Sequence, residues 1–184
     1  MGSGQLSIFD KETKKRYGRA SYGGNTKGKR KLERPLSTKK SLHVVLKSDK
    51  ARGKYSFLTP TNKLKVDRIL KEKSKKFGVK ILSLANVGNH LHLKIKISTR
   101  ETFQKFLIAT TALIAREITG ARKGKPFGKF WSGLAFTRVI NSRREELIID
   151  GYITANQIES RTSPRVREQF RKAYSEWLKD CRSS

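Results

Sequence analysis

One stretch decides the fold: Asn89-His90-Leu91-His92-Leu93-Lys94-Ile95-Lys96-Ile97. Apolar and polar residues alternate along it without interruption. Successive side chains of a β-strand point to opposite faces, so this alternation predicts a half-buried strand. The leucine and isoleucine face is expected to lie in the core, and the other face, with two histidines and two lysines, is expected to be open.

The two histidines of this strand suggest chemistry. Side chains at positions i and i+2 share a strand face, so His90 and His92 could converge on one divalent metal ion. The chain has only three histidines, which makes the pair notable. A pair of polar residues without a function on a solvent-facing strand is the alternative. The neighbouring Lys94 and Lys96 suit a phosphate-binding surface.

Composition points to a polyanionic partner. The chain has 184 residues, which is one domain with tails or two small domains. It carries 43 Lys and Arg against 15 Asp and Glu, a net charge of +28. Such a field attracts nucleic acid. A membrane partner is not expected, because the sequence contains no basic amphipathic helix with a clean aromatic edge and no apolar run of membrane-spanning length.

The cysteine count and the N-terminus bear on the compartment. Cys181 is the single cysteine, which excludes an internal disulfide framework and a cysteine-based zinc site. Both the single cysteine and the absence of a signal-peptide pattern at residues 1–10 are consistent with a reducing cytoplasm.

The segments around the histidine strand predict an α+β sheet. Strands are expected at 42–47, 79–87 and 134–140, with helices at about 60–77 and 100–120. Gly88-Asn89 is a turn signal that joins two of the strands into an antiparallel hairpin. The order strand, helix, strand, strand, helix, strand is typical of a ferredoxin-like, RNA-recognition-like antiparallel sheet with helices on one face.

We divide the chain into a flexible basic arm (1–40), a central domain that contains the histidine strand (41–160) and a C-terminal helix (161–184) that begins at Ser163-Pro164. The Gly- and Lys-rich loop at 121–129 is a second basic segment. Either basic segment could bind the phosphate backbone of a nucleic acid, or it could be a solvated segment without a partner. The candidate nucleic-acid contacts are Arg30, Lys31, Lys94, Lys96, Arg122, Lys123 and Lys125.

A helix capped by Asn141-Ser142 offers the rest of a nuclease-like site. Tyr152 and Asn156 are four residues apart and share a face of this helix. Tyr152 could attack a phosphorus atom, and the Asn156 amide oxygen could join the imidazoles on Mg²⁺ or Mn²⁺. A tyrosine on a helix is more often a core residue with its hydroxyl at the rim. His43, the third histidine, could approach the metal, although a hydrogen-bonded structural role is commoner.

Four segments together resemble a known family. They are Leu42-His43-Val44-Val45-Leu46, Asn89-His90-Leu91-His92-Leu93, Phe130-Trp131-Ser132 and Tyr152-Ile153-Thr154-Ala155-Asn156. In this order and spacing the sequence is similar to the HUH single-tyrosine transposases, and among them to the REP-associated tyrosine transposases, over about residues 39–160. The family usually has proline directly after the asparagine, where this chain has Gln157.

The resemblance implies a ferredoxin-like core, a divalent metal on His90 and His92 with Asn156 as third ligand, and Tyr152 as nucleophile. It implies cleavage and rejoining of single-stranded DNA, a hairpin with flanking sequence, through a 5′-phosphotyrosine. It is compatible with a homodimer and implies a bacterial, cytoplasmic, nucleoid-associated protein. An inactive relative is an alternative.

Two further readings compete with the enzyme. A non-catalytic nucleic-acid-binding module on the same sheet would be favoured by aromatic residues on the open face, where this strand has Lys and His. A structural protein of a ribonucleoprotein particle would explain the charge but gives the histidine pattern no purpose.

Overall fold

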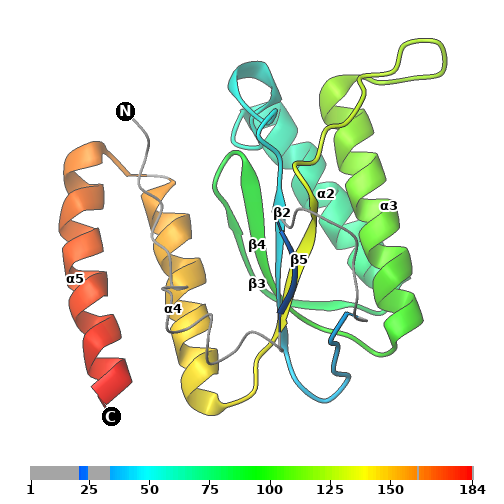
Figure 1. Cartoon of the computed structure of the whole chain (residues 1–184). Coiled ribbons are helices and arrows are strands. Elements are labelled where there is room, and N and C mark those ends of the chain that lie inside the picture. The colour runs from blue at the N-terminus through cyan, green and yellow to red at the C-terminus, as the bar shows by residue number, and fades with distance from the viewer. Residues whose placement is uncertain (1–20, 25–33, 161, 184) are drawn as a thin grey trace.

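The computed structural model of the chain describes residues 21–24, 34–160 and 162–183. A five-stranded sheet in the order β1-β5-β2-β4-β3 forms its centre, and every neighbouring pair is antiparallel (Figure 1). The strands are β1 (Ser21–Gly24), β2 (Leu42–Lys47), β3 (Lys80–Asn86), β4 (His90–Lys96) and β5 (Leu134–Val139). The helices are η1 (Gly53–Tyr55), α2 (Pro60–Lys76), α3 (Arg100–Thr119), α4 (Arg143–Glu159) and α5 (Pro164–Ser183). The predicted α+β class and the order of its six central elements are confirmed.

The hairpin of β3 and β4 sets the position of the histidine strand. Gly88 turns the chain with a φ of 93°, a conformation that glycine adopts without steric cost. Its backbone N–H donates to the Asn86 side-chain oxygen at 3.0 Å, and the Val87 N–H donates to the His90 carbonyl at 3.0 Å. Because β2 pairs with the other edge of β4, the histidine strand is an interior strand of the sheet.

Local signals in the sequence determine where the helices begin and end. Pro60 is the first residue of α2, where its missing N–H costs nothing. Thr99 caps α3 in a reciprocal capping box with Thr102, and Gly120 ends that helix with a φ of 69°. The Ser142 side chain accepts a hydrogen bond from the Glu145 N–H and caps α4. The predicted cap of α4 at Asn141-Ser142 is confirmed, with Ser142 as the capping residue.

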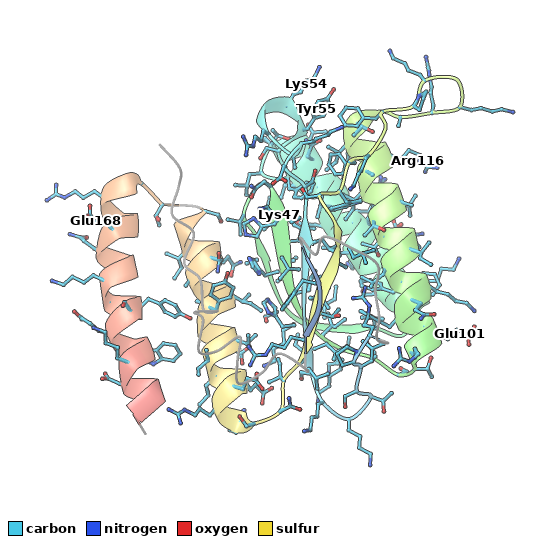
Figure 2. The ribbon with its side chains drawn as sticks, in the orientation of Figure 1. Lys47, Lys54, Tyr55, Glu101, Arg116 and Glu168 are labelled. Atoms are coloured by element: carbon cyan, nitrogen blue, oxygen red, sulfur yellow. The ribbon has the colours of Figure 1, made fainter. Side chains whose placement is uncertain are left out.

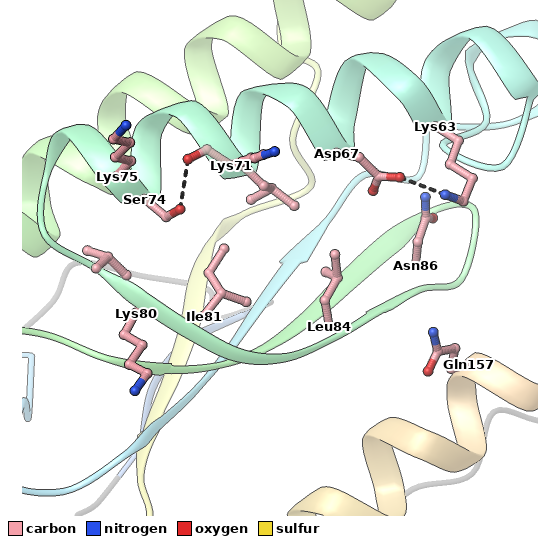
Figure 3. A pocket seen from close by; sticks show the side chains of 12 residues that line it. Lys63, Asp67, Lys71, Ser74, Lys75, Lys80, Ile81, Leu84, Asn86 and Gln157 are labelled. Carbon is pink, nitrogen blue, oxygen red and sulfur yellow. Dashed lines mark hydrogen bonds and ion pairs between the residues drawn. The ribbon is translucent and has the colours of Figure 1, made fainter.

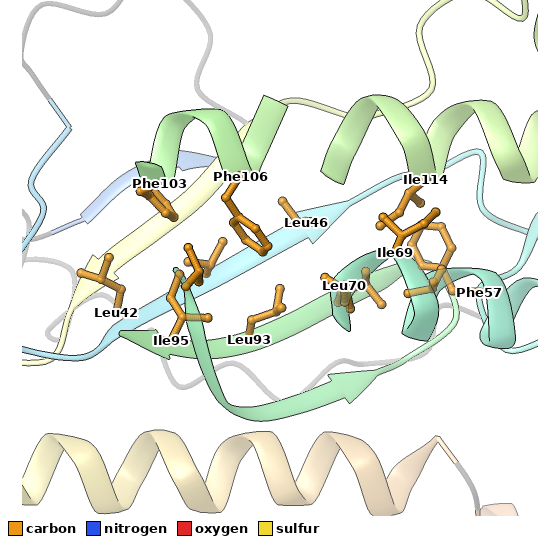
Figure 4. Close-up of a cluster of buried hydrophobic side chains, with 14 of the residues drawn as sticks. Leu42, Leu46, Phe57, Ile69, Leu70, Leu93, Ile95, Phe103, Phe106 and Ile114 are labelled. Carbon is orange, nitrogen blue, oxygen red and sulfur yellow. The ribbon is translucent and has the colours of Figure 1, made fainter. Parts of the chain in front are cut away.

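The main core lies between the sheet and the two helices α2 and α3 (Figure 4). Leu91, Leu93 and Ile95 from the histidine strand are fully buried in it. Phe103 and Phe106 of α3 pack on them from above, as the helical periodicity predicts. The main-core residues that have almost no exposed surface include Leu42, Leu46, Phe57, Leu70 and Ile114.

The second face of the sheet, which the sequence interpretation left open, is covered by α4. This helix packs against β3 and β4, and α5 packs against the outside of α4 (Figure 1). A second buried cluster fills this interface; its members are Ala85, Ile140, Ile149, Tyr152, Ile153, Ala155 and Tyr174. The structure therefore corrects the expectation that His90 and His92 face solvent, because the apolar side of α4 has to be buried and this face is where it packs.

The N-terminal segment contains a strand that the sequence did not predict. Ser21–Gly24 forms β1 and pairs with β5 at the sheet edge, with Ser21 opposite Arg138. Arg34 contacts β5: its guanidinium donates to the Ala135 carbonyl at 2.9 Å and to the Thr137 hydroxyl at 2.7 Å. Arg30 and Lys31, two predicted nucleic-acid contacts, lie outside the described residues. None of the described helices is long and apolar enough to cross a membrane.

Candidate active site

His90 and His92 lie side by side on the face of the sheet that α4 covers. Their ring centroids are 4.7 Å apart and edge to face, and the exposed fractions of the two residues are 4% and 2%. The His90 Nδ1 is 2.6 Å from the Asn89 side-chain oxygen. An amide oxygen only accepts hydrogen bonds, so Nδ1 carries the proton and the lone pair of His90 is on Nε2.

His43 on β2 completes a cluster of three imidazoles. Its Nε2 is 3.3 Å from the His92 Nδ1, and the two rings stack with centroids 5.5 Å apart. The His43 residue has no exposed surface. The contact engages Nδ1 of His92, and Nε2 of His92 is buried without a hydrogen-bond partner. His43 therefore orients the ring of His92, which is the structural role that the sequence analysis favoured for it.

Helix α4 places Tyr152 directly over these rings. The Tyr152 ring meets the His92 ring edge to face at a centroid distance of 5.1 Å and the His43 ring at 6.1 Å. One helical turn further on, Asn156 is 2% exposed, and its side-chain nitrogen donates to the Tyr152 carbonyl at 2.8 Å. This hydrogen bond uses the side-chain nitrogen of Asn156, so its side-chain oxygen is the atom that could bind a metal ion. The structure thus brings the predicted nucleophile against the predicted metal-binding histidines.

The imidazoles are held in their neutral form. Burial, and after it the charge of Arg138, lowers the pKa of His43 from 6.5 to about 3. Burial, and after it the charge of Lys47, lowers the pKa of His90 to about 4; Lys47 lies opposite His90 at the end of β2 (Figure 2). Burial followed by the charges of His43 and His90 lowers the pKa of His92 well below its usual range. Neutral imidazole is the state that binds metal ions.

The donor set is consistent with a divalent ion, although it is not a complete cage of charged ligands. Among the described residues, no group of three His, Cys, Asp or Glu side chains is arranged to hold a metal ion. The unpartnered Nε2 of the buried His92 fits the role of a ligand, because an orphaned buried nitrogen is otherwise costly. Two imidazoles and one amide oxygen suit Mn²⁺ and, with water or phosphate oxygens added, Mg²⁺.

Lys94 holds α4 on the sheet, whereas the sequence analysis expected it to line bound DNA. Its side chain is 7% exposed, and its ammonium group lies 2.8 Å from Glu146 and 2.7 Å from Asp150, both on α4. Burial alone would lower the pKa of Lys94, but its hydrogen bonds to Asp150 and Glu146 outweigh burial and raise it. Lys94 is therefore charged and neutralised by α4 in this arrangement, so the expectation that it lies on an open sheet face is corrected.

A second ion pair holds the N-terminal turn of α4. Arg138 of β5 contacts Glu145, and both side chains are nearly inaccessible to solvent. The other Glu145 oxygen accepts the Asn141 N–H at 2.6 Å. Glu145 and Tyr152 are seven residues, about two helical turns, apart and share a face of α4. This pair and the Lys94 pairs hold the helix that carries the tyrosine against the sheet.

The C-terminal helix packs close to the tyrosine from the other side of α4. A Cβ atom at Gly151 would lie 2.7 Å from two ring carbons of Trp177 on α5, which is closer than a normal carbon contact. The Trp177 ring in turn stacks on Tyr174, with centroids 5.5 Å apart. Gly151, beside the candidate nucleophile, is therefore the position that allows α5 to approach α4.

The remaining predicted nucleic-acid contacts lie apart from the histidines. Lys96 is exposed at the far end of β4. Arg122, Lys123 and Lys125 are exposed in a loop that Gly124 turns and that projects beyond the end of α3 (Figure 1). The structure does not bring these side chains together with Tyr152.

Comparison with known proteins assigns the chain to a family. A family model described as "Transposase IS200 like" matches residues 37–157, well over half of the chain. The chain belongs to this transposase family, in agreement with the resemblance found in its motifs. It is also similar in structure to a candidate transposase from Deinococcus radiodurans R1, at 19% identity, covering 72% of this chain and 98% of that chain with a TM-score of 0.41. No curated protein matches the chain.

Proposed function

We propose that this transposase cleaves and rejoins single-stranded DNA, with Tyr152 as the nucleophile. The observation that carries the proposal is the edge-to-face contact of Tyr152 with His92, at 5.1 Å between ring centroids. Asn156 lies one helical turn beyond Tyr152, so a phosphate bound at the histidines would have the phenol and the amide within reach.

The reaction forms one bond and breaks one. The Tyr152 phenol loses its proton to solvent, and its oxygen attacks the scissile phosphorus. The bond between the phosphorus and the 3′ oxygen of the preceding nucleotide breaks, and that oxygen takes up a proton to become a 3′-hydroxyl. The product is a 5′-phosphotyrosine. Because the ester bond energy is conserved, attack by another 3′-hydroxyl reverses the step and joins a new strand.

A divalent cation at His90, His92 and Asn156 would polarise the phosphate and stabilise the charge that develops on it. The protein contributes the neutral imidazoles that such an ion requires, and His43 fixes the ring of His92. A phenol has a pKa near 10 in model peptides, so the positive surroundings that favour the phenolate are needed at neutral pH.

Access to the site requires α4 to move. Tyr152 is 4% exposed, and both histidines are buried beneath it. The scissile phosphate therefore has to enter between α4 and the sheet, where it competes with the ion pairs of Lys94 and Arg138 for positive charge. In this proposal the docked helix is the resting arrangement, and DNA binding opens it.

The test is a covalent adduct on a denaturing gel. Wild-type protein incubated with labelled single-stranded oligonucleotides, including hairpins, and Mn²⁺ or Mg²⁺ should form a protein–DNA adduct that chelation prevents. Tyr152→Phe should lose adduct and cleavage together while keeping its DNA affinity, because only one hydroxyl is removed. The matched control is Tyr174→Phe, since Tyr174 is buried in the same cluster and should keep the activity. An adduct that peptide mass spectrometry maps to another tyrosine would refute the assignment.

A non-catalytic DNA-binding relative is the second candidate, and the deep burial of Tyr152 favours it. It predicts binding without an adduct for the wild type under all metal conditions, and a small stability loss in Tyr152→Phe. Light scattering with and without the oligonucleotide measures whether the protein forms the homodimer with which the family resemblance is compatible.

A further inference from the structure

Helix α2 and the edge strand β3 enclose an open groove of about 780 Å³ outside the candidate active site (Figure 3). This volume is in the range of sites that hold a ligand. Lys71 and Lys75 line it from α2, and Lys80 lines it from β3. Ile81 and Leu84 give it a partly apolar floor.

The groove carries uncompensated positive charge. Lys63 at one end is paired with Asp67 at 2.6 Å. Lys71, Lys75 and Lys80 are exposed, and no ion pair joins any of them to another residue in the described part of the chain. Three unpaired ammonium groups that face one groove attract a polyanion.

The apolar floor of the groove favours single-stranded over double-stranded DNA. Ile81 and Leu84 are half-buried, so part of their apolar surface can be contacted from the groove. An unpaired strand offers apolar base faces together with its phosphates, whereas a duplex shows mainly phosphate and sugar at its outer surface. Lysines on the rims and aliphatic side chains between them fit the single strand.

The groove leads away from the histidines. One end is at Asn86, which pairs with Leu91, the residue between His90 and His92. This end is therefore close to the histidines along the strand but lies on the other face of the sheet, and a DNA strand would reach it by passing round the edge strand β3. Gln157, the neighbour of Asn156, lines the same end (Figure 3). The other end is at Lys80, which pairs with Lys96. Seven residues of strand span roughly 20 Å, so a chain lying in the groove would extend from the candidate site along the edge of the sheet.

We propose that the α2–β3 groove binds the part of the single-stranded DNA that adjoins the scissile phosphate. Its phosphates contact Lys71, Lys75 and Lys80, and its bases contact Ile81 and Leu84. The inference rests on the proposed function for the direction in which the strand runs. The competing account is that lysines beside an edge strand only prevent pairing with another chain.

The experiment compares two triple variants that each remove three positive charges. The groove variant is Lys71→Gln/Lys75→Gln/Lys80→Gln. The control is Lys39→Gln/Lys54→Gln/Lys172→Gln, whose lysines are exposed, lie outside the groove and, like those of the groove, form no ion pair within the described residues. Affinity for a labelled single-stranded oligonucleotide of mixed sequence is measured by fluorescence anisotropy over a salt series without divalent cations. Thermal unfolding should be the same for both variants, since all six side chains are exposed.

Each phosphate contact to a single strand contributes about 0.7 to the slope of log affinity against log salt. The groove variant should therefore lose about 2 from this slope, and about tenfold to a hundredfold in affinity at low salt, relative to the control. A Lys→Arg triple at the same three positions should bind like the wild type.

Equal losses in the two triples would overturn the proposal, because net charge alone would then explain binding. A loss for duplex DNA without a loss for the single strand would also overturn it. If the wild type forms the Tyr152 adduct while the groove variant binds like the control, the groove is wrong and the proposed function stands. If the groove variant loses affinity selectively while the wild type forms no adduct, the groove stands and the proposed chemistry fails.

Discussion

Replacing Glu145 with Gln should destabilise the domain by about 3 kcal/mol or more. The Glu145 side chain is 7% exposed, and that of its partner Arg138 is 5% exposed. The substitution leaves the guanidinium buried opposite a neutral group, and breaking a buried pair by removing one partner typically costs about 3–5 kcal/mol. The backbone contact to Asn141 can survive, because Gln keeps one side-chain oxygen. A domain is stable by only about 5–15 kcal/mol, so the loss should be readily measured.

The matched control is Glu146→Gln, one residue further along α4. Glu146 is 28% exposed, and its partner Lys94 keeps Asp150 at 2.7 Å after the change. Water and the remaining carboxylate compensate most of the lost interaction, so we expect a cost below about 1 kcal/mol.

Equilibrium urea unfolding followed by circular dichroism measures both variants. The double variant Arg138→Met/Glu145→Leu should recover most of the lost stability, because a well-packed apolar pair commonly replaces a buried ion pair without loss. A Glu145→Gln variant that is no less stable than Glu146→Gln would refute the view that the buried pair determines how α4 is held.

Two further predictions concern the surroundings of the tyrosine. Burial lowers the folded-state pKa of His43 to about 3 and of His90 to about 4, whereas both residues have a pKa near 6.5 in the unfolded chain. The free energy of unfolding is therefore highest above pH 6.5 and decreases as the pH falls from 6.5 to these folded-state values. At pH 5 the unfolded chain binds the extra protons, and each residue should cost on the order of 2 kcal/mol relative to pH 7; urea unfolding that is unchanged between these pH values would contradict the neutral cluster. Gly151→Ala adds about 1 kcal/mol of helix propensity but forces the Trp177 ring, 2.7 Å from the new Cβ, to move outward. In a Trp131→Phe background the emission of Trp177 should shift to the red, and an unshifted spectrum would show that α5 does not pack as described.

Much of the fold could be predicted from the sequence because its signals are local. The alternation in residues 89–97 identifies the histidine strand and its core face, and Pro60, Thr99 and Gly120 mark helix ends through the hydrogen-bonding needs of the backbone. The prediction that Tyr152 lies near the histidines rested instead on the spacing of Tyr152 and Asn156 within one helix and on the family motif. The structure places these groups together.

What the sequence did not predict depends on contacts between distant elements. Alternation separates the two faces of a strand but does not say what covers the second face. A signal was present: Glu146 and Asp150 are four residues apart on a helix with an apolar side, so that helix could pack over a lysine. β1 gave no signal, because Ser21–Gly24 is joined to the sheet by backbone pairing and its residues have no apolar alternation. The groove was missed because α2 and β3 carry its lysines separately.

The position of β2 between β4 and β5 has a consequence for the order in which the chain folds. The β3–β4 hairpin closes a short loop, whereas His43 and His92 are 49 positions apart and come together only when β2 joins the hairpin. Helix α4 follows β5 in the chain and packs on a face that β3 and β4 must already have formed. Assembly of the tyrosine with the histidines is therefore expected to be a late event, so that a nascent or partly folded chain keeps its candidate nucleophile separated from the groups that would activate it.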